Sequence, residues 1–122
     1  MKQKTFSFQS RLNSFGFAFN GLFKFFREEP NAWIHLIATV AVITGAAYFK
    51  ISAGELIALI IVMGFVWVAE IFNTVVERIM DFITTQRNPK VEFIKDLAAG
   101  AVLVSSIIAA ITGAIVFIPK LF

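Results

Sequence analysis

The chain has 122 residues, a length that suits a single domain. Hydrophobic residues make up 58% of it and charged residues only 16%, a balance that excludes a typical soluble domain and indicates a small integral membrane protein. It contains no cysteine, which excludes disulfides and thiolate chemistry, and membrane topology explains its net charge of +3 better than nucleic-acid binding does.

The segment 6–28 is expected to form an amphipathic helix that lies in the membrane interface. From Leu12 onward its apolar positions follow steps of three and four residues, which places them on one helical face. These positions are Leu12, Phe15, Phe19, Leu22, Phe23 and Phe26. Because the segment has no continuous apolar stretch followed by small residues, it is not expected to be a cleavable signal peptide.

Three membrane-spanning helices are predicted after this segment, at about 31–49, 53–83 and 96–118. The first should begin near Pro30 and Asn31, because proline suits a first turn and asparagine is a good cap. The second should begin after Ser52, where a capping box would close on Glu55. At about 45 Å it would exceed the hydrocarbon core, so its last turns should reach the headgroups. Residues 84–91, with an Asn-Pro pair, are expected to form a loop.

The distribution of Lys and Arg predicts the orientation in the membrane. Nine of the 11 lie before the first span or between the second and third spans, and the other two are Lys50 and Lys120. Because positive residues are retained in the cytoplasm, the amino terminus and the 84–95 loop should be cytoplasmic and the carboxyl terminus should lie on the opposite side.

Four polar residues interrupt the second span: Glu70, Asn73, Glu77 and Asp81. At about 100° per residue they fall within roughly 80° of one another, so they form a single stripe on one helix face. Acids and amides near hydrocarbon are costly and are therefore functional candidates. The predicted topology directs this polar stripe toward the cytoplasmic boundary.

Further charged residues, Glu29, Lys95 and Asp96, are expected at the same boundary. Carboxylate and amide oxygens suit Mg²⁺, lysine suits phosphate, and one carboxylate can serve as a general base, which together fit phosphoryl transfer. There is no P-loop motif and no Gly-rich kinase loop. On spacing alone, a proton or cation transporter that uses Glu70 fits almost as well, and a purely structural polar seam is a third interpretation.

The sequence motifs that carry these residues resemble the family of prokaryotic diacylglycerol kinase and undecaprenol kinase. The segment AEIFNTVVERIMD (69–81) resembles the signature A-E-[LI]-x-N-[TS]-[AV]-[IV]-E-x-x-x-D, and KDLAAGAVL from Lys95 resembles a second motif, in which Ile94 replaces the usual alanine. Two amino-terminal patterns also match, and the resemblance covers about 11–119. Their matching positions are Arg11, Phe15, Ala18, Gly21, Leu22, Glu29, Asn31, Ile34 and His35.

The resemblance implies an all-α membrane protein, with an amphipathic surface helix and three transmembrane helices that assemble as a homotrimeric bundle in the bacterial cytoplasmic membrane. Such proteins transfer the γ-phosphate of MgATP to a lipid hydroxyl at the cytoplasmic interface, and no nucleic acid is involved. Transfer should be direct and in line, because no histidine or cysteine is placed to carry the phosphoryl group.

The resemblance also implies roles for individual positions. Glu70 matches the catalytic base, and Glu29 and Glu77 match the ligands of Mg²⁺. The positions that match nucleotide-binding residues are Asn73, Glu77, Lys95, Asp96 and Gly21. Arg11 and Asp81, together with Glu70, match positions that contact substrate or organise the site.

The substrate is expected to be undecaprenol rather than diacylglycerol. His35 and the Ala-Ala-Gly run that begins at Ala98 resemble the undecaprenol kinase branch of the family. His35 itself is interpreted as a hydrogen-bonding anchor at the membrane boundary, because a single imidazole there is more often an anchor than a ligand.

Overall fold

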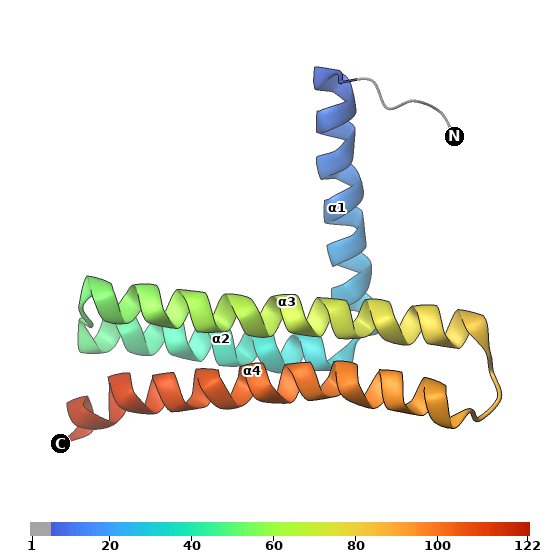
Figure 1. Cartoon of the computed structure of the whole chain (residues 1–122). Helices are drawn as coiled ribbons and strands as arrows, with labels where there is room; N and C mark the ends of the chain where they lie inside the picture. Colours follow the sequence, from blue (N-terminus) through green and yellow to red (C-terminus); the bar gives the residue numbers. More distant parts are fainter. Residues whose placement is uncertain (1–5) are drawn as a thin grey trace.

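The fold consists of α-helices joined by short connections. The computed structural model describes residues 6–122, which contain no strand and form the helices α1 (Phe8–Glu28), α2 (Pro30–Phe49), α3 (Ala53–Ile83) and α4 (Pro89–Leu121). Helices α2, α3 and α4 lie side by side as a bundle, and α1 projects away from it (Figure 1). The predicted all-helical fold is confirmed. Lys2 and Lys4, two of the cations used to predict orientation, lie outside the described residues.

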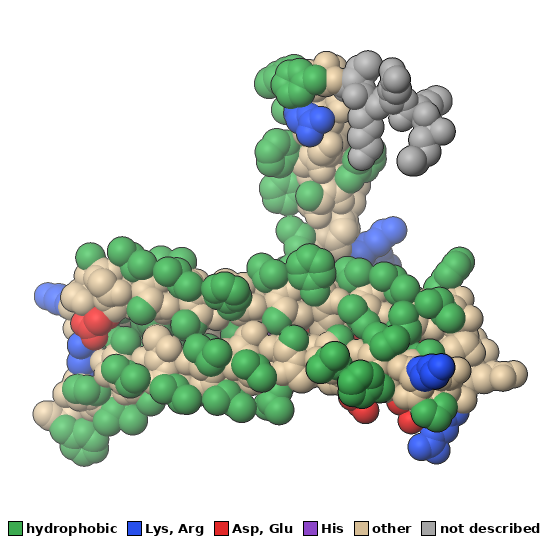
Figure 2. All heavy atoms as spheres, in the orientation of Figure 1, with side chains coloured by type: hydrophobic (Ala, Val, Ile, Leu, Met, Phe, Trp, Pro, Cys, Tyr) green, Lys and Arg blue, Asp and Glu red, His purple; other side chains and the backbone are tan. Residues whose placement is uncertain are grey.

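The bundle helices have the length and composition of membrane spans. Helices α2, α3 and α4 are each long and apolar enough to cross a membrane. With 31 and 33 residues, α3 and α4 extend to about 46 and 50 Å, well beyond a hydrocarbon core of about 30 Å. Hydrophobic side chains cover the length of the bundle, and charged ones gather toward its two ends (Figure 2). These helices have the length and composition of a membrane protein, and α3 and α4 are longer than a hydrocarbon core is thick.

Local capping signals set the starts of α2 and α3. At α3 the capping box is present as predicted: the Glu55 N–H donates to Ser52 Oγ, and the Ser52 N–H donates to Glu55 Oε1, both at 3.1 Å. Pro30 is the first residue of α2, but the cap position belongs to Glu29, whose side chain makes no capping hydrogen bond. Asn31 was therefore wrong as a cap, because a proline at the first helical position makes the preceding residue the cap.

The loop between α3 and α4 is shorter than the sequence indicated. Helix α4 begins at Pro89, so residues 89–95 are helical and the expected loop at 84–91 ends at Asn88. The Asn88 side chain accepts hydrogen bonds from the N–H groups of Lys90 and Val91, at 2.9 and 3.4 Å. The Asn-Pro pair is thus a helix start, with asparagine as the cap and proline at the first position, rather than a turn within a longer loop.

Helices α3 and α4 form an antiparallel hairpin that is paired at both ends. Lys95 Nζ donates to Asp81 Oδ1 at 2.8 Å near the connecting turn, and Lys120 Nζ donates to Glu55 Oε2 at 2.9 Å at the opposite end. Helix α2 lies along this hairpin (Figure 1), where Gly45 faces the ring of Phe117 so closely that an added Cβ would lie 3.3 Å from it. The two ion pairs therefore set the register of α3 against α4, and α2 packs closely on α4 at Gly45.

Helix α1 contacts the bundle at its carboxyl-terminal end. The ring of Phe26 packs on Trp33 and Trp67, with centroids 6.1 and 5.5 Å apart, and Trp33 Nε1 donates to the carbonyl of Phe26 at 2.8 Å. Most other apolar residues of α1 are exposed, including Phe15 and Phe19. An exposed aromatic face is what a helix in the membrane interface would carry, and that placement of α1 stays a prediction.

Candidate active site

The polar stripe of α3 passes from the interior of the bundle to its surface. Glu70 and Asn73 are its buried members, with 2% and 8% of their surface exposed. Glu77 is half-buried, and Asp81, near the turn that connects α3 to α4, is exposed. A carboxylate and an amide are thus enclosed among apolar helices, an arrangement that needs polar partners to be tolerated.

The partner of Glu70 is His35, which projects from α2. His35 Nε2 lies 3.3 Å from Glu70 Oε2, and the imidazole is itself packed edge-on against the ring of Trp67, with centroids 6.0 Å apart. The His35 side chain is 19% exposed, so it lies closer to the surface than the carboxylate that it contacts. The contact was not predicted: the two residues are 35 positions apart, and the sequence signal was limited to a single histidine near the start of the first span.

Asn73 and Glu77 are joined one turn further along the stripe. Asn73 Nδ2 donates to Glu77 Oε1 at 3.5 Å, whereas Asn73 Oδ1 is buried and has no hydrogen-bond partner among residues 6–122. A buried amide oxygen without a partner is costly, so this atom is available for a donor or cation from outside the chain. Together with the Glu77 carboxylate, it offers oxygen ligands of the kind that Mg²⁺ prefers.

An arginine brings the two acids that precede α2 to the same region of α3. Arg78 Nη2 lies 2.7 Å from Glu28 Oε2 and 3.6 Å from Glu29 Oε1, and Arg78 follows Glu77 directly in the chain. Neither Arg78 nor Glu28 is among the expected site residues, yet Glu28 is the closer partner of the arginine. In the part of the chain that the structure describes, no three acidic or histidine side chains gather into a metal site. The expected pair, Glu29 and Glu77, is therefore at one end of α3 but does not form a complete coordination shell.

The exposed end of the stripe borders a hollow of about 470 Å³ at the α3–α4 turn. Its lining includes the ion pair between Asp81 and Lys95, and also Arg87 and Glu92, which pair with each other at 2.7 Å. Lys95 was expected near phosphate, and the structure places it across from the last residue of the stripe. This end of the bundle is the one that carries the positive charges of the predicted cytoplasmic loop.

Three expected site residues lie apart from this group. Asp96, Gly21 and Arg11 are exposed, and within residues 6–122 no hydrogen bond or ion pair joins any of them to the stripe. Gly21 has open space around its Cα, and the guanidinium of Arg11 lies 5.5 Å from the centre of the Phe6 ring. The fold of one chain thus gathers the expected residues of α3 with Glu29 and Lys95, but not Asp96 of α4 or the two residues of α1.

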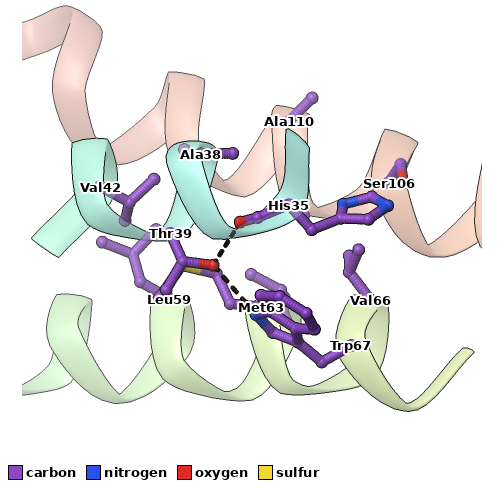
Figure 3. Close-up of a pocket in the computed structure, with 13 residues that line it drawn as sticks. His35, Ala38, Thr39, Val42, Leu59, Met63, Val66, Trp67, Ser106 and Ala110 are labelled. Atoms are coloured by element: carbon purple, nitrogen blue, oxygen red, sulfur yellow. Dashed lines mark hydrogen bonds between the residues drawn. The ribbon is translucent and has the colours of Figure 1, made fainter. Parts of the chain in front are cut away.

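A cavity of about 250 Å³ opens between α2, α3 and α4, with His35 in its wall (Figure 3). Its walls are mostly aliphatic, and the polar groups are His35, Thr39, Trp67 and Ser106. Thr39 Oγ1 donates to the carbonyl of His35 at 2.7 Å and accepts from Trp67 Nε1 at 2.9 Å, so both groups have partners within the protein. Nothing in the sequence pointed to Thr39, because a threonine inside an apolar span carries no distinctive signal.

Comparison with known proteins identifies relatives that cover this site. The profile of the family described as prokaryotic diacylglycerol kinase matches residues 16–117, which include every expected site residue except Arg11. The chain is 34% identical to an undecaprenol kinase of Bacillus subtilis over 108 residues, which cover 88% of each chain. It is 35% identical to a diacylglycerol kinase of Synechocystis sp. over 111 residues, which cover 90% of this chain and 63% of that relative.

Proposed function

The chain belongs to the prokaryotic diacylglycerol kinase family, and we propose that it is a membrane lipid kinase that transfers the γ-phosphate of MgATP to the hydroxyl of a lipid alcohol. The observation that carries this proposal is the buried carboxylate of Glu70 and the buried amide of Asn73 on a membrane-spanning helix. Such a pair is costly in an apolar bundle. In the predicted orientation, a lipid hydroxyl from the bilayer would meet a phosphate donor from the cytoplasm at this pair.

Glu70 is the residue that we assign as general base. As the oxygen of the lipid hydroxyl bonds to the γ-phosphorus, the hydroxyl proton passes to the Glu70 carboxylate and ADP leaves from the opposite side of the phosphorus. The burial of Glu70 supports this role, because electrostatic interactions are stronger where water is excluded. The transfer is direct and in line.

The oxygen groups of the stripe fit a magnesium ion. Glu77, with Glu29 from the start of α2, would supply carboxylate oxygens, and the unpartnered Oδ1 of Asn73 lies next to Glu77. Two protein carboxylates suffice where water and phosphate oxygens complete the shell. Bound there, Mg²⁺ would neutralise the phosphate charge.

The nucleotide is proposed to bind at the surface end of the stripe. Lys95 would supply a positive charge for phosphate, with Asn73, Glu77, Asp96 and Gly21 as further nucleotide-binding positions. Asp81 is assigned an organising role, which its 2.8 Å contact with Lys95 supports. Arg11, on α1, is assigned a site-organising or substrate-contacting role on family resemblance, and homotrimeric assembly is proposed on the same ground.

Undecaprenol is the substrate that we favour over diacylglycerol. The relative named undecaprenol kinase aligns over 88% of both chains, whereas the relative named diacylglycerol kinase is a longer protein. His35 and the Ala-Ala-Gly run after Asp96 support the same choice. The protein would act in the bacterial inner membrane, with its amino terminus and the α3–α4 turn in the cytoplasm.

A micelle assay with labelled ATP tests this proposal. The purified protein is mixed in detergent with labelled ATP, Mg²⁺ and either undecaprenol or diacylglycerol, and the label in the lipid fraction is measured. Magnesium-dependent labelling that is faster with undecaprenol is expected. Label on neither lipid, together with proton flux into liposomes without ATP, would contradict the kinase and favour transport through Glu70.

A further inference from the structure

His35 connects the apolar cavity to the buried carboxylate of Glu70. The cavity between α2, α3 and α4 is lined by His35 but not by Glu70, whose exposure is only 2%. His35 Nε2 lies 3.3 Å from Glu70 Oε2. A molecule in the cavity can therefore touch the imidazole, whereas the carboxylate lies behind it.

The cavity has one polar end and one apolar end. His35 and Ser106 lie at one end and Val42 at the other (Figure 3). The wall formed by α4 extends from Ser106 to Gly113, about 10 Å along the helix axis. His35 is near the start of α2, on the predicted cytoplasmic side, so the polar end of the cavity is also the end nearer to ATP. This gradient suits a lipid alcohol, with the start of its chain among the aliphatic residues and its hydroxyl at His35.

We propose that His35 is a catalytic residue that relays the proton of the lipid hydroxyl to Glu70. As the hydroxyl oxygen bonds to the γ-phosphorus, its proton moves to His35 Nδ1, and the proton on Nε2 moves to Glu70 Oε2. The imidazole ends neutral, the carboxylate ends protonated, and ADP carries away the electrons of the broken phosphorus–oxygen bond. The relay rests on the proposed kinase function and explains how a buried carboxylate can be the final base.

The surroundings of the imidazole suit this role. Nε2 faces Glu70, and no hydrogen bond joins Nδ1 to any other residue within 6–122, which leaves Nδ1 available to a substrate. Among the described residues, Glu70 is the one acidic side chain within 4 Å of a ring nitrogen of His35. The other polar neighbours are Trp67 from α3 and Ser106 from α4, and neither side chain ionises near neutral pH. In the Ser-His-Asp arrangement a carboxylate orients an imidazole that takes the hydroxyl proton, and the carboxylate stays ionised. The relay proposed here differs in that Glu70 takes the proton on Nε2.

His35→Gln separates a relay from a positioning role. A glutamine places an amide N–H near the position of Nε2, so a polar group stays beside Glu70, but it has no nitrogen that accepts a proton and passes one on. We expect kcat for the lipid that the wild type phosphorylates to fall at least about 100-fold, with KM for ATP unchanged within twofold. Ser105→Ala is the control, because Ser105 donates to the carbonyl of Ala101 at 2.8 Å and does not line the cavity; this variant should keep kcat within about twofold.

The outcomes are decisive in either direction. A His35→Gln protein that retains more than a third of the wild-type kcat would overturn the relay, and so would an equal loss in Ser105→Ala. If His35→Gln does not fold, His35→Ala assayed with added imidazole takes its place: a gain of tenfold or more supports the relay, and no gain overturns it. A wild type that phosphorylates no lipid would instead reject the proposed function.

Discussion

Replacing Glu70 with glutamine tests the central carboxylate of the site. Glutamine has nearly the same shape and keeps a carbonyl oxygen beside His35, whose Nε2 lies 3.3 Å from the carboxylate. It cannot accept a proton from a hydroxyl at neutral pH. The change therefore removes the proposed base with little alteration of the packing around a side chain that is 2% exposed.

The expected loss of activity is large and the expected loss of stability is small. General-base catalysis contributes about 10²–10⁴-fold, so kcat should fall by that factor, which corresponds to about 2.7–5.4 kcal/mol in the activation free energy. The stability effect is limited to the single polar contact that Glu70 makes in the described chain, worth about 1 kcal/mol. Nucleotide binding and the midpoint of thermal unfolding in detergent should therefore stay close to those of the wild type.

The assay measures transfer of labelled phosphate to undecaprenol in micelles, with ATP affinity and thermal unfolding measured on the same samples. Glu55→Gln is the matched control, because it makes the same chemical change on the same helix, where Glu55 pairs with Lys120 at 2.9 Å far from the site. Glutamine also serves in a capping box, so this variant should fold and keep its kcat. A Glu70→Gln protein with near-wild-type turnover would refute the assignment of Glu70 as base.

Three further changes test the metal site, the packing and the backbone. Glu77→Gln should raise the Mg²⁺ concentration for half-maximal activity about tenfold or more, while excess Mg²⁺ restores most of kcat; an unchanged Mg²⁺ titration would exclude Glu77 as a ligand. Trp67→Phe removes the 2.9 Å hydrogen bond to Thr39 and should lower the free energy of unfolding by about 1 kcal/mol. An unfolding midpoint equal to that of the wild type would show that this hydrogen bond does not stabilise the fold. Lys50→Gly should raise that free energy by about 1 kcal/mol, because Lys50 ends α2 in the left-handed conformation at a φ of 51°, which glycine adopts without strain; a lowered midpoint with unchanged activity would contradict this.

Much of the fold was predictable because its signals are local. The capping box at Ser52 and the proline at the start of α2 depend on neighbours in the chain, and apolar length alone indicates the spanning helices. The polar stripe follows from helical periodicity, so the shared face of Glu70 and Asn73 needed no tertiary information. The start of α4 was misplaced because an Asn-Pro pair is compatible with both a turn and a capped helix, and only the hydrogen bonds of Asn88 distinguish them.

The contacts between helices could not be predicted from one sequence. His35 meets Glu70, and Arg78 meets Glu28 and Glu29, because the bundle places specific faces of separate helices together. Periodicity shows which residues share a face but not which neighbour that face meets. The cavity beside His35 has the same origin, since its walls come from three helices.

The sequence by itself determined that this is a helical membrane protein with acids and an amide aligned inside one span, and it indicated the kinase family through those residues. These conclusions rest on composition, periodicity and short motifs, which are properties of neighbouring residues. The tertiary structure decided how deeply each polar residue is buried, and it placed the imidazole of His35 between Glu70 and a cavity. Burial and pairing depend on how α2, α3 and α4 pack, and packing joins residues that the chain keeps far apart.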